Sequence, residues 1–171
     1  MVERDGQSWL VVEDIDEHLG RGVISCAEVA PDGAIGEPRA ILVGDAHLSY
    51  PLVFEDGGQT YLLPESRAEG RVRLYRAASF PDRWEAVADL YDGPAMDTTV
   101  WHDDRWWFFT SLREPRGLAT MLWLFHADTL TGPWISHPLN PIPSDIRDSR
   151  AGGPPTPQAG RPHAPTRGGA R

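Results

Sequence analysis

The chain has 171 residues, of which 40% are hydrophobic and seven are Trp, and this is enough apolar material for one globular core. Its formal net charge is -9 and all sixteen basic residues are Arg, so a basic surface that neutralises nucleic-acid phosphates is hard to assemble. These features argue against a nucleic-acid partner and against disorder along the whole chain.

The N-terminal stretch MVERDGQSWL has neither the basic leader nor the apolar run of a signal peptide. Cys26 is the only cysteine, so no internal disulfide can form. No apolar run reaches the roughly 18 residues that a membrane-spanning helix needs. We therefore expect a cytoplasmic protein without a membrane span.

Three segments share one pattern, in which an apolar residue is followed by a turn rich in Asp and Gly, then by an aromatic residue and large apolar residues. They are VERDGQSWLVVE from Val2, VFEDGGQTYLLPE from Val53 and VWHDDRWWFFT from Val100. This pattern is typical of β-hairpins, and it predicts tight turns at Asp5-Gly6, Asp56-Gly57 and Asp103-Asp104.

A third strand-like run follows each hairpin, and the three runs end at alanines spaced 50 residues apart, Ala27, Ala77 and Ala127. In the last two copies, Trp84 and Trp134 open a fourth strand seven residues later. Four antiparallel strands in each fifty residues, without a helical period, are what one blade of a β-propeller needs. A β-sandwich is the alternative, but it has no reason to repeat at this interval.

Two composition regimes divide the chain. Residues 1–150 hold about three such blades, whereas closed propellers have about four to eight. From residue 151 onward the sequence is rich in Gly, Pro and Arg and has no apolar residue larger than Ala, so it has nothing to bury. We expect an all-β, partial β-propeller domain over residues 1–150 and a disordered tail over residues 151–171.

Polar and ionisable residues gather where the strands of the second hairpin begin and end. In an antiparallel hairpin, the start of the first strand and the end of the second lie at the same end, opposite the turn. This places His47, Ser49 and Tyr50 beside Glu65. Pro64 has no N–H to donate, so it ends the ladder or lies on its free side and leaves Glu65 at the strand exit.

The other two hairpins carry polar residues at the corresponding end, namely Asp97 and Arg113 in the third and Glu13 in the first. Carboxylates there can accept hydrogen bonds from sugar hydroxyls, and an Arg offers a fixed fork to an anionic substituent. In a second interpretation, Glu65 only caps a loop or pairs with Arg67.

The sequence contains no strong motif for a metal or a cofactor. The run EDIDEH from Glu13 resembles a calcium loop only loosely. No G-x-S-x-G, H-E-x-x-H or P-loop motif occurs. We therefore expect no metal and no cofactor.

Several long stretches resemble the N-terminal domain of the glucosamine inositolphosphorylceramide transferase family. They are HLSYPLVFEDGGQTYLLPES from His47, LYRAASFPDRW from Leu74, the Asp97-Thr98 pair, LTGPWISHPLNPI from Leu130 and SDIRDSR from Ser144. The resemblance covers about residues 2–150 and implies a fold like the five-bladed propellers of glycoside hydrolase family 43. Such domains occur alone or beside formyltransferase-like domains in bacteria.

The resemblance also implies a function. Family-43-like hydrolases are inverting enzymes with an Asp base in the first blade, a second Asp and a Glu acid, and inversion needs acid and base about 6.5–9.5 Å apart. Because the first blade of the present sequence starts at Val2 to Gly6, we expect the strand that would carry the base to be missing. The sequence after SDIRDSR also departs from the relatives. We expect a truncated chain that has no activity alone.

Our first hypothesis is a carbohydrate-associated domain that binds glycans or assists a sugar-modifying transferase. The alternative is an inverting glycoside hydrolase in which Glu65 or Asp97 acts as the catalytic acid or base. A third possibility is an interaction scaffold without ligand affinity. The expected partners are a carbohydrate or glycoconjugate, with a transferase domain or the missing blades of the same propeller beside it. The expected substrate-binding residues are Glu13, His47, Ser49, Tyr50 and Arg113.

Overall fold

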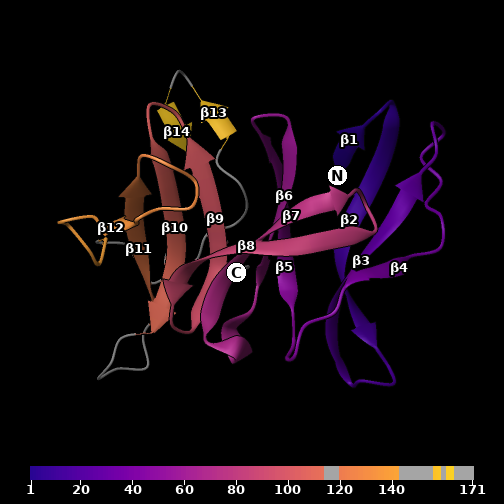
Figure 1. The fold of residues 1–171 in the computed structure, drawn as a ribbon, viewed down its shortest axis with the longest axis horizontal. Helices are drawn as coiled ribbons and strands as arrows, with labels where there is room; N and C mark the ends of the chain where they lie inside the picture. The colour runs from indigo at the N-terminus through magenta and orange to yellow at the C-terminus, as the bar shows by residue number, and fades with distance from the viewer. Residues whose placement is uncertain (114–119, 143–155, 159–160, 164–171) are drawn as a thin grey trace, which may run out of the picture. The chain divides into compact units, whose positions relative to one another are not determined.

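The structure is a computed structural model that describes residues 1–113, 120–142, 156–158 and 161–163. Within these ranges the chain consists of β-strands, their connections and one short 3-10 turn, η1 (Arg67–Glu69). Three four-stranded antiparallel sheets follow one another along the sequence (Figure 1). The all-β architecture predicted from the fifty-residue repeat is confirmed.

In each of the three sheets the strands are neighbours in the order of the sequence, which is the connectivity of a propeller blade. The first sheet contains β1 (Val2–Arg4), β2 (Gln7–Asp16), β3 (Arg21–Val29) and β4 (Arg39–Leu42). The second contains β5 (Ser49–Asp56), β6 (Gln59–Glu65), β7 (Arg71–Ser79) and β8 (Arg83–Asp92). The third contains β9 (Ala95–His102), β10 (Trp106–Arg113), β11 (Thr120–Ala127) and β12 (Ile135–Ser136).

The predicted disordered tail over residues 151–171 falls largely outside the described residues. Its described parts are two short paired strands, β13 (Thr156–Gln158) and β14 (Arg161–His163).

The chain divides into two compact units. Unit 1 comprises Met1–Glu69 and Arg73–Ala88, and unit 2 comprises Gly70–Val72 and Asp89–Arg171. Unit 1 therefore contains the first sheet and most of the second, and unit 2 contains the third sheet.

The hairpin turns explain why strand pairing starts where it does. Asp5 and Gly6 form the first turn, as predicted, and their φ angles of 52° and 76° are those of a type I′ turn, which matches the twist of the strands. The second turn was predicted one residue too early. It consists of Gly57 and Gly58, because two glycines adopt the required positive φ without steric cost, and Asp56 is left inside the strand.

The third turn is longer than predicted. His102 pairs with Trp106, so residues 103–105 form a three-residue turn where the sequence suggested only Asp103-Asp104. The Oδ1 atom of Asp103 accepts hydrogen bonds from the Arg105 N–H at 3.2 Å and from the Trp107 indole at 3.0 Å, which hold this longer turn in place.

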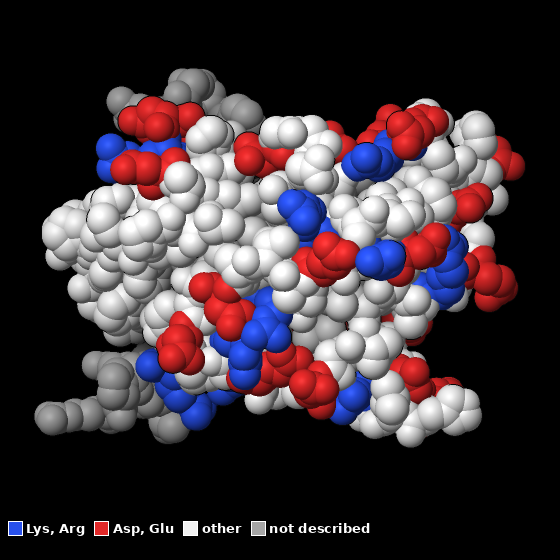
Figure 2. All heavy atoms as spheres, viewed as in Figure 1, with Lys and Arg blue, Asp and Glu red and all other residues white. Residues whose placement is uncertain are grey.

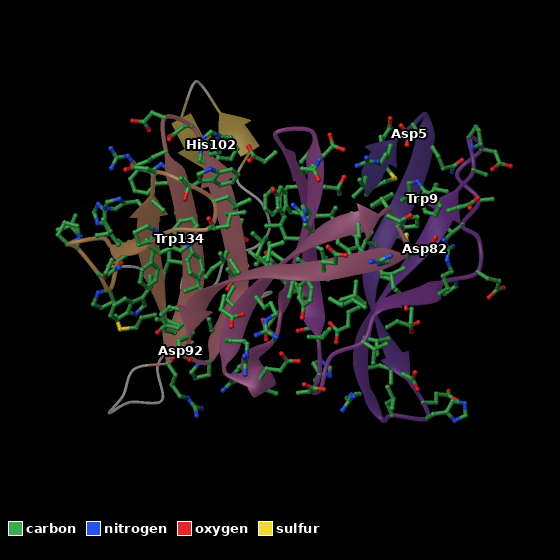
Figure 3. All side chains as sticks on the ribbon, in the orientation of Figure 1. Asp5, Trp9, Asp82, Asp92, His102 and Trp134 are labelled. Atoms are coloured by element: carbon green, nitrogen blue, oxygen red, sulfur yellow. The ribbon has the colours of Figure 1, made fainter. Side chains whose placement is uncertain are left out.

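The core of unit 1 forms where apolar side chains of the first and second sheets meet. Trp9 and Trp84 are partly buried against this core. Arg39 joins the two sheets at the edge of the core. Its guanidinium lies over the ring of Trp9 in the first sheet and binds Asp82 on the β7–β8 turn of the second. Trp9 and Asp82 are labelled in Figure 3. The fully packed members are Ile24, Cys26, Ile41, Leu48, Leu62 and Tyr75.

Unit 2 has an aromatic core of its own. Phe108 is fully buried and stacks on Phe125 with ring centroids 5.2 Å apart, while Trp134 meets Phe108 edge to face at 5.5 Å. Figure 2 shows acidic and basic side chains interspersed over much of the drawn face, apart from an uncharged area over β11 and β12. In unit 1, Arg76 and Glu85 form one ion pair at 3.9 Å.

Candidate functional site

The first strand of the second sheet begins with a β-bulge. Ser49 pairs with Glu65, but the register then shifts, so that Tyr50 and Pro51 lie opposite the single residue Pro64. A bulge interrupts the ladder of hydrogen bonds, and a residue without an N–H is tolerated there. The bulge therefore explains why a strand can carry Pro64 directly before the carboxylate of Glu65.

The third sheet repeats this bulge at the corresponding position. Asp97 and Thr98 lie opposite Thr110, whose hydroxyl is 2.9 Å from that of Thr98 and donates to the Met96 carbonyl at 3.0 Å. Asp97 and Tyr50 have φ angles of 49° and 45°, in the left-handed region that residues other than glycine rarely occupy. Bulges and such backbone strain are concentrated at functional sites, because they redirect side chains.

His47 is held in one orientation by contacts with β3. The Gly22 N–H donates to Nδ1 of His47 at 2.9 Å, and the Leu48 N–H donates to the Gly22 carbonyl at 3.0 Å. Because Nδ1 accepts, the neutral ring carries its proton on Nε2, which lies 3.1 Å from Oε1 of Glu13. Gly22 allows this approach, since a Cβ atom there would lie 2.4 Å from the Leu48 carbonyl oxygen and 2.7 Å from Cε1 of His47.

The loop that leads into His47 is fastened at two further points. Arg21 donates to the carbonyls of Gly44 and Asp45 at 2.7 and 2.6 Å. Oε1 of Glu69, at the end of η1, accepts a hydrogen bond from the Asp45 N–H at 3.2 Å. The position of His47 is therefore set by β3 and by η1 together.

An open hollow of about 380 Å³ lies in unit 1 and is lined by His47, Glu65, Arg67 and Ala68. This volume lies within the range of small-molecule sites. The side chains of His47 and Glu13 are 46% and 40% exposed, so both are accessible to solvent. The hollow offers an imidazole, a carboxylate and a guanidinium, which are hydrogen-bonding groups suited to a polar ligand.

The structure places five of the predicted site residues in unit 1. Glu13 contacts His47, and Ser49 pairs with Glu65 next to Tyr50. The other two predicted residues, Asp97 and Arg113, lie in unit 2, where Asp97 is only 2% exposed and Arg113 is exposed at the end of β10. Their grouping with Glu65 in one site stays a prediction.

The sequence did not indicate a functional role for four residues of this site. Arg21 and Gly22 hold the segment around His47, and Arg67 and Ala68 line the hollow. The Gly20-Arg21-Gly22 stretch contains a signal, since a glycine inside a strand marks a close approach of another segment. The approaching segment, around His47, lies 25 residues later, and no local pattern identifies it.

Among the described residues, no group of three or more His, Cys, Asp and Glu side chains is arranged to hold a metal ion. The described part of the chain also contains no helix that is long and apolar enough to cross a membrane.

Comparison with solved structures identifies glycoside hydrolases of similar fold. An endo-arabinase from Bacteroides thetaiotaomicron superposes with a TM-score of 0.66 at 16% identity, covering 85% of this chain and 61% of that chain. A thermostable family-43 glycoside hydrolase gives a TM-score of 0.57 at 14% identity, covering 81% of this chain and 52% of that chain. At these identities the likeness concerns the fold alone, and it confirms the predicted fold class, a propeller of the five-bladed type with about three blades present.

The sequence also has relatives among curated proteins. It is 36% identical over 126 residues to glucosamine inositolphosphorylceramide transferase 1 of Oryza sativa subsp. japonica, and 34% identical over 126 residues to the protein of that name from Arabidopsis thaliana. Each alignment covers 71% of this chain but only 17% and 16% of the relatives, so the chain spans a small part of their length. Residues 3–163 match the family described as "Glucosamine inositolphosphorylceramide transferase 1, N-terminal", and the chain belongs to this family.

Proposed function

We propose that this chain is a glycan-binding domain whose binding site is the hollow lined by His47, Glu65 and Arg67. The observation that carries the proposal is the fixed imidazole at the edge of the hollow, bound by the Gly22 N–H on one side and by Glu13 on the other. A ring that is already immobilised loses little conformational entropy when a ligand binds. The carboxylate of Glu65 can accept hydrogen bonds from vicinal hydroxyls, which sugars supply.

The ligand class follows from the chemistry of the hollow and from the relatives. The curated relatives are named for glucosamine and for inositolphosphorylceramide, which combine a sugar, a polyol and a phosphate. The Arg67 guanidinium offers a planar fork that fits a phosphate group. We infer that the hollow takes a hydroxylated, phosphate-bearing headgroup and that the domain presents it to a sugar-modifying transferase.

The test is isothermal titration calorimetry of the chain with myo-inositol 1-phosphate and with glucosamine, which measures the heat of binding. We expect saturable binding that weakens about tenfold or more, about 1.4 kcal/mol, on Glu65→Gln or Arg67→Met. Glu37→Gln is the matched control, because Glu37 is an exposed carboxylate of unit 1 on the loop before β4, outside the hollow. Absence of binding, or equal binding by all variants, would refute the proposal and favour an interaction scaffold.

A second candidate function is inverting glycoside hydrolysis, and one observation favours it. Asp97 is buried at a bulge with a strained φ angle of 49°, the kind of position at which catalytic groups are held. Hydrolysis of aryl glycosides that is lost on Glu65→Gln and on Asp97→Asn would support this function. Binding of the headgroup without any turnover would exclude it.

A further inference from the structure

Unit 2 contains a hollow of its own, at the end of the third sheet that carries the β9–β10 turn. Trp106 pairs with Ala127, so this turn lies beside the segment that follows β11. The opposite end of the same strands carries Asp97 and Arg113, so the hollow is separate from the predicted site. Its volume is about 520 Å³, and its principal lining residues are Arg105, His126, Asp128, Thr129, Pro133 and Ile135.

Two hydrogen-bond donors line one side of the hollow. Nη1 of Arg105 lies 3.5 Å from Nδ1 of His126. Because the guanidinium is always protonated, Nδ1 faces it as an acceptor, and the neutral ring then carries its proton on Nε2 as a second donor. In the part of the chain that the structure describes, no carboxylate lies within ion-pair distance of Arg105, so its remaining N–H groups are available.

Acceptors and an apolar wall line the other side. Asp128 is exposed, and the Thr129 hydroxyl donates to the Gly132 carbonyl at 2.6 Å, which leaves the hydroxyl oxygen free to accept. The Gly132 N–H donates back to the Thr129 carbonyl at 2.9 Å, so this turn is stiff. Pro133 and Ile135 are exposed apolar residues, with Ile135 56% exposed.

The charge distribution argues for a neutral ligand. Asp103 and Asp104 directly precede Arg105 in the turn, and Asp128 lines the hollow itself. Carboxylates therefore outnumber the guanidinium and repel a free anion. Figure 2 shows charged side chains gathered at the β9–β10 turn beside an uncharged surface over β11 and β12. Paired donors and acceptors beside an apolar wall match a pyranose, which has vicinal hydroxyls and an apolar C–H face.

We propose that this hollow is a second carbohydrate site, and that it takes a neutral pyranose. Arg105 and Asp128 bind neighbouring ring hydroxyls, and Pro133 and Ile135 pack against the C–H face. The site goes beyond the proposed function, because it uses other residues and a different unit, and one site can fail while the other stands.

The experiment is an amide and indole NMR titration with methyl β-D-glucopyranoside in the Glu65→Gln variant, in which the hollow of unit 1 is impaired. The Trp107 indole is a reporter, since it donates to Asp103 and its ring lies 5.8 Å from that of His126. We expect saturable shifts of this signal and of the Arg105 amide. Asp128→Asn should weaken binding at least fivefold and Arg105→Gln about tenfold.

Asp92→Asn is the matched control, because Asp92 is an exposed carboxylate of unit 2 at the end of β8, outside the hollow. Asp128→Asn changes an exposed residue and keeps the test valid where Arg105→Gln fails to fold. Three outcomes would overturn the proposal: no saturable shift, an equal affinity of the Asp128→Asn and Asp92→Asn variants, or tighter binding of inorganic phosphate or glucuronate than of the neutral sugar.

Discussion

Replacing Gly22 by Ala tests the account of how His47 is positioned. A Cβ atom at this position would lie 2.4 Å from the Leu48 carbonyl oxygen, closer than the 3.0 Å below which real Cβ atoms essentially never approach another heavy atom. The obstacle is backbone, so a side-chain rotation cannot relieve it. The segment of His47 and Leu48 must therefore move away from β3.

The expected loss of stability follows from the contacts that this movement breaks. The two hydrogen bonds between Gly22 and the segment of His47 and Leu48 contribute about 0.5–1.5 kcal/mol each. Leu48 is fully buried in the core of unit 1, and partial exposure of a leucine costs a fraction of the roughly 1.5–3 kcal/mol of its burial. We expect Gly22→Ala to lower the free energy of unfolding by about 2–4 kcal/mol.

Urea unfolding monitored by Trp fluorescence measures this loss, and the headgroup titration measures its effect on the site. Gly36→Ala is the control, because its Cβ atom would lie 3.5 Å from the nearest atom, an ordinary contact, and should change stability by less than about 0.5 kcal/mol. If Gly22→Ala and Gly36→Ala unfold alike and bind the headgroup alike, the close approach does not position His47.

Three further predictions concern charge and burial. Burial raises the pKa of the Cys26 thiol, and the positive charge of Arg39 opposes this increase only in part. A disulfide reagent should therefore label Cys26 at least 100-fold more slowly in the native protein than in urea. Rapid labelling of the native protein would contradict the burial of Cys26. Burial raises the pKa of Asp103, but its hydrogen bonds outweigh burial and lower the pKa below the ordinary value of 3.8. The ionised carboxylate therefore stabilises the fold above the ordinary pKa, and this stabilisation is lost as the pH falls through the lower folded-state pKa. We expect Asp103→Asn to flatten the acid dependence of the urea midpoint below about pH 4. Arg39 and Asp82 are 2.7 Å apart, but their side chains are 46% and 60% exposed. A double-mutant cycle with Arg39→Met and Asp82→Asn should therefore give a coupling energy below about 1 kcal/mol that decreases as salt is added. A coupling energy above about 2 kcal/mol would be inconsistent with an exposed pair. Arg39→Met alone should cost more than Asp82→Asn, because the Arg39 guanidinium also covers the Trp9 ring at 5.7 Å.

The sheets of this protein could be predicted from the sequence because each strand pairs with its neighbour in the chain. Alternating apolar residues, a turn of small residues and a repeat of fifty residues are local features, and they determine a meander without any knowledge of distant contacts. Even the error at the second turn was local, since Gly57-Gly58 and Asp56-Gly57 differ by one residue in a run that permits both. The pairing of Ser49 with Glu65, opposite the turn, follows from the same antiparallel geometry.

The environment of each candidate side chain was decided only by the tertiary structure. His47 precedes β5 but contacts Glu13 and Gly22, which lie 34 and 25 residues earlier, in the first sheet. Asp97 is buried, although the sequence placed it among the residues expected to bind sugar hydroxyls. The bulges at Tyr50 and Asp97 could have been noticed from their equal distance before Val53 and Val100, but the positive φ angles could not. Hairpin pairing depends on residues that are close in sequence, whereas the contacts between sheets depend on how side chains of different blades pack, and no periodicity within one blade contains that information.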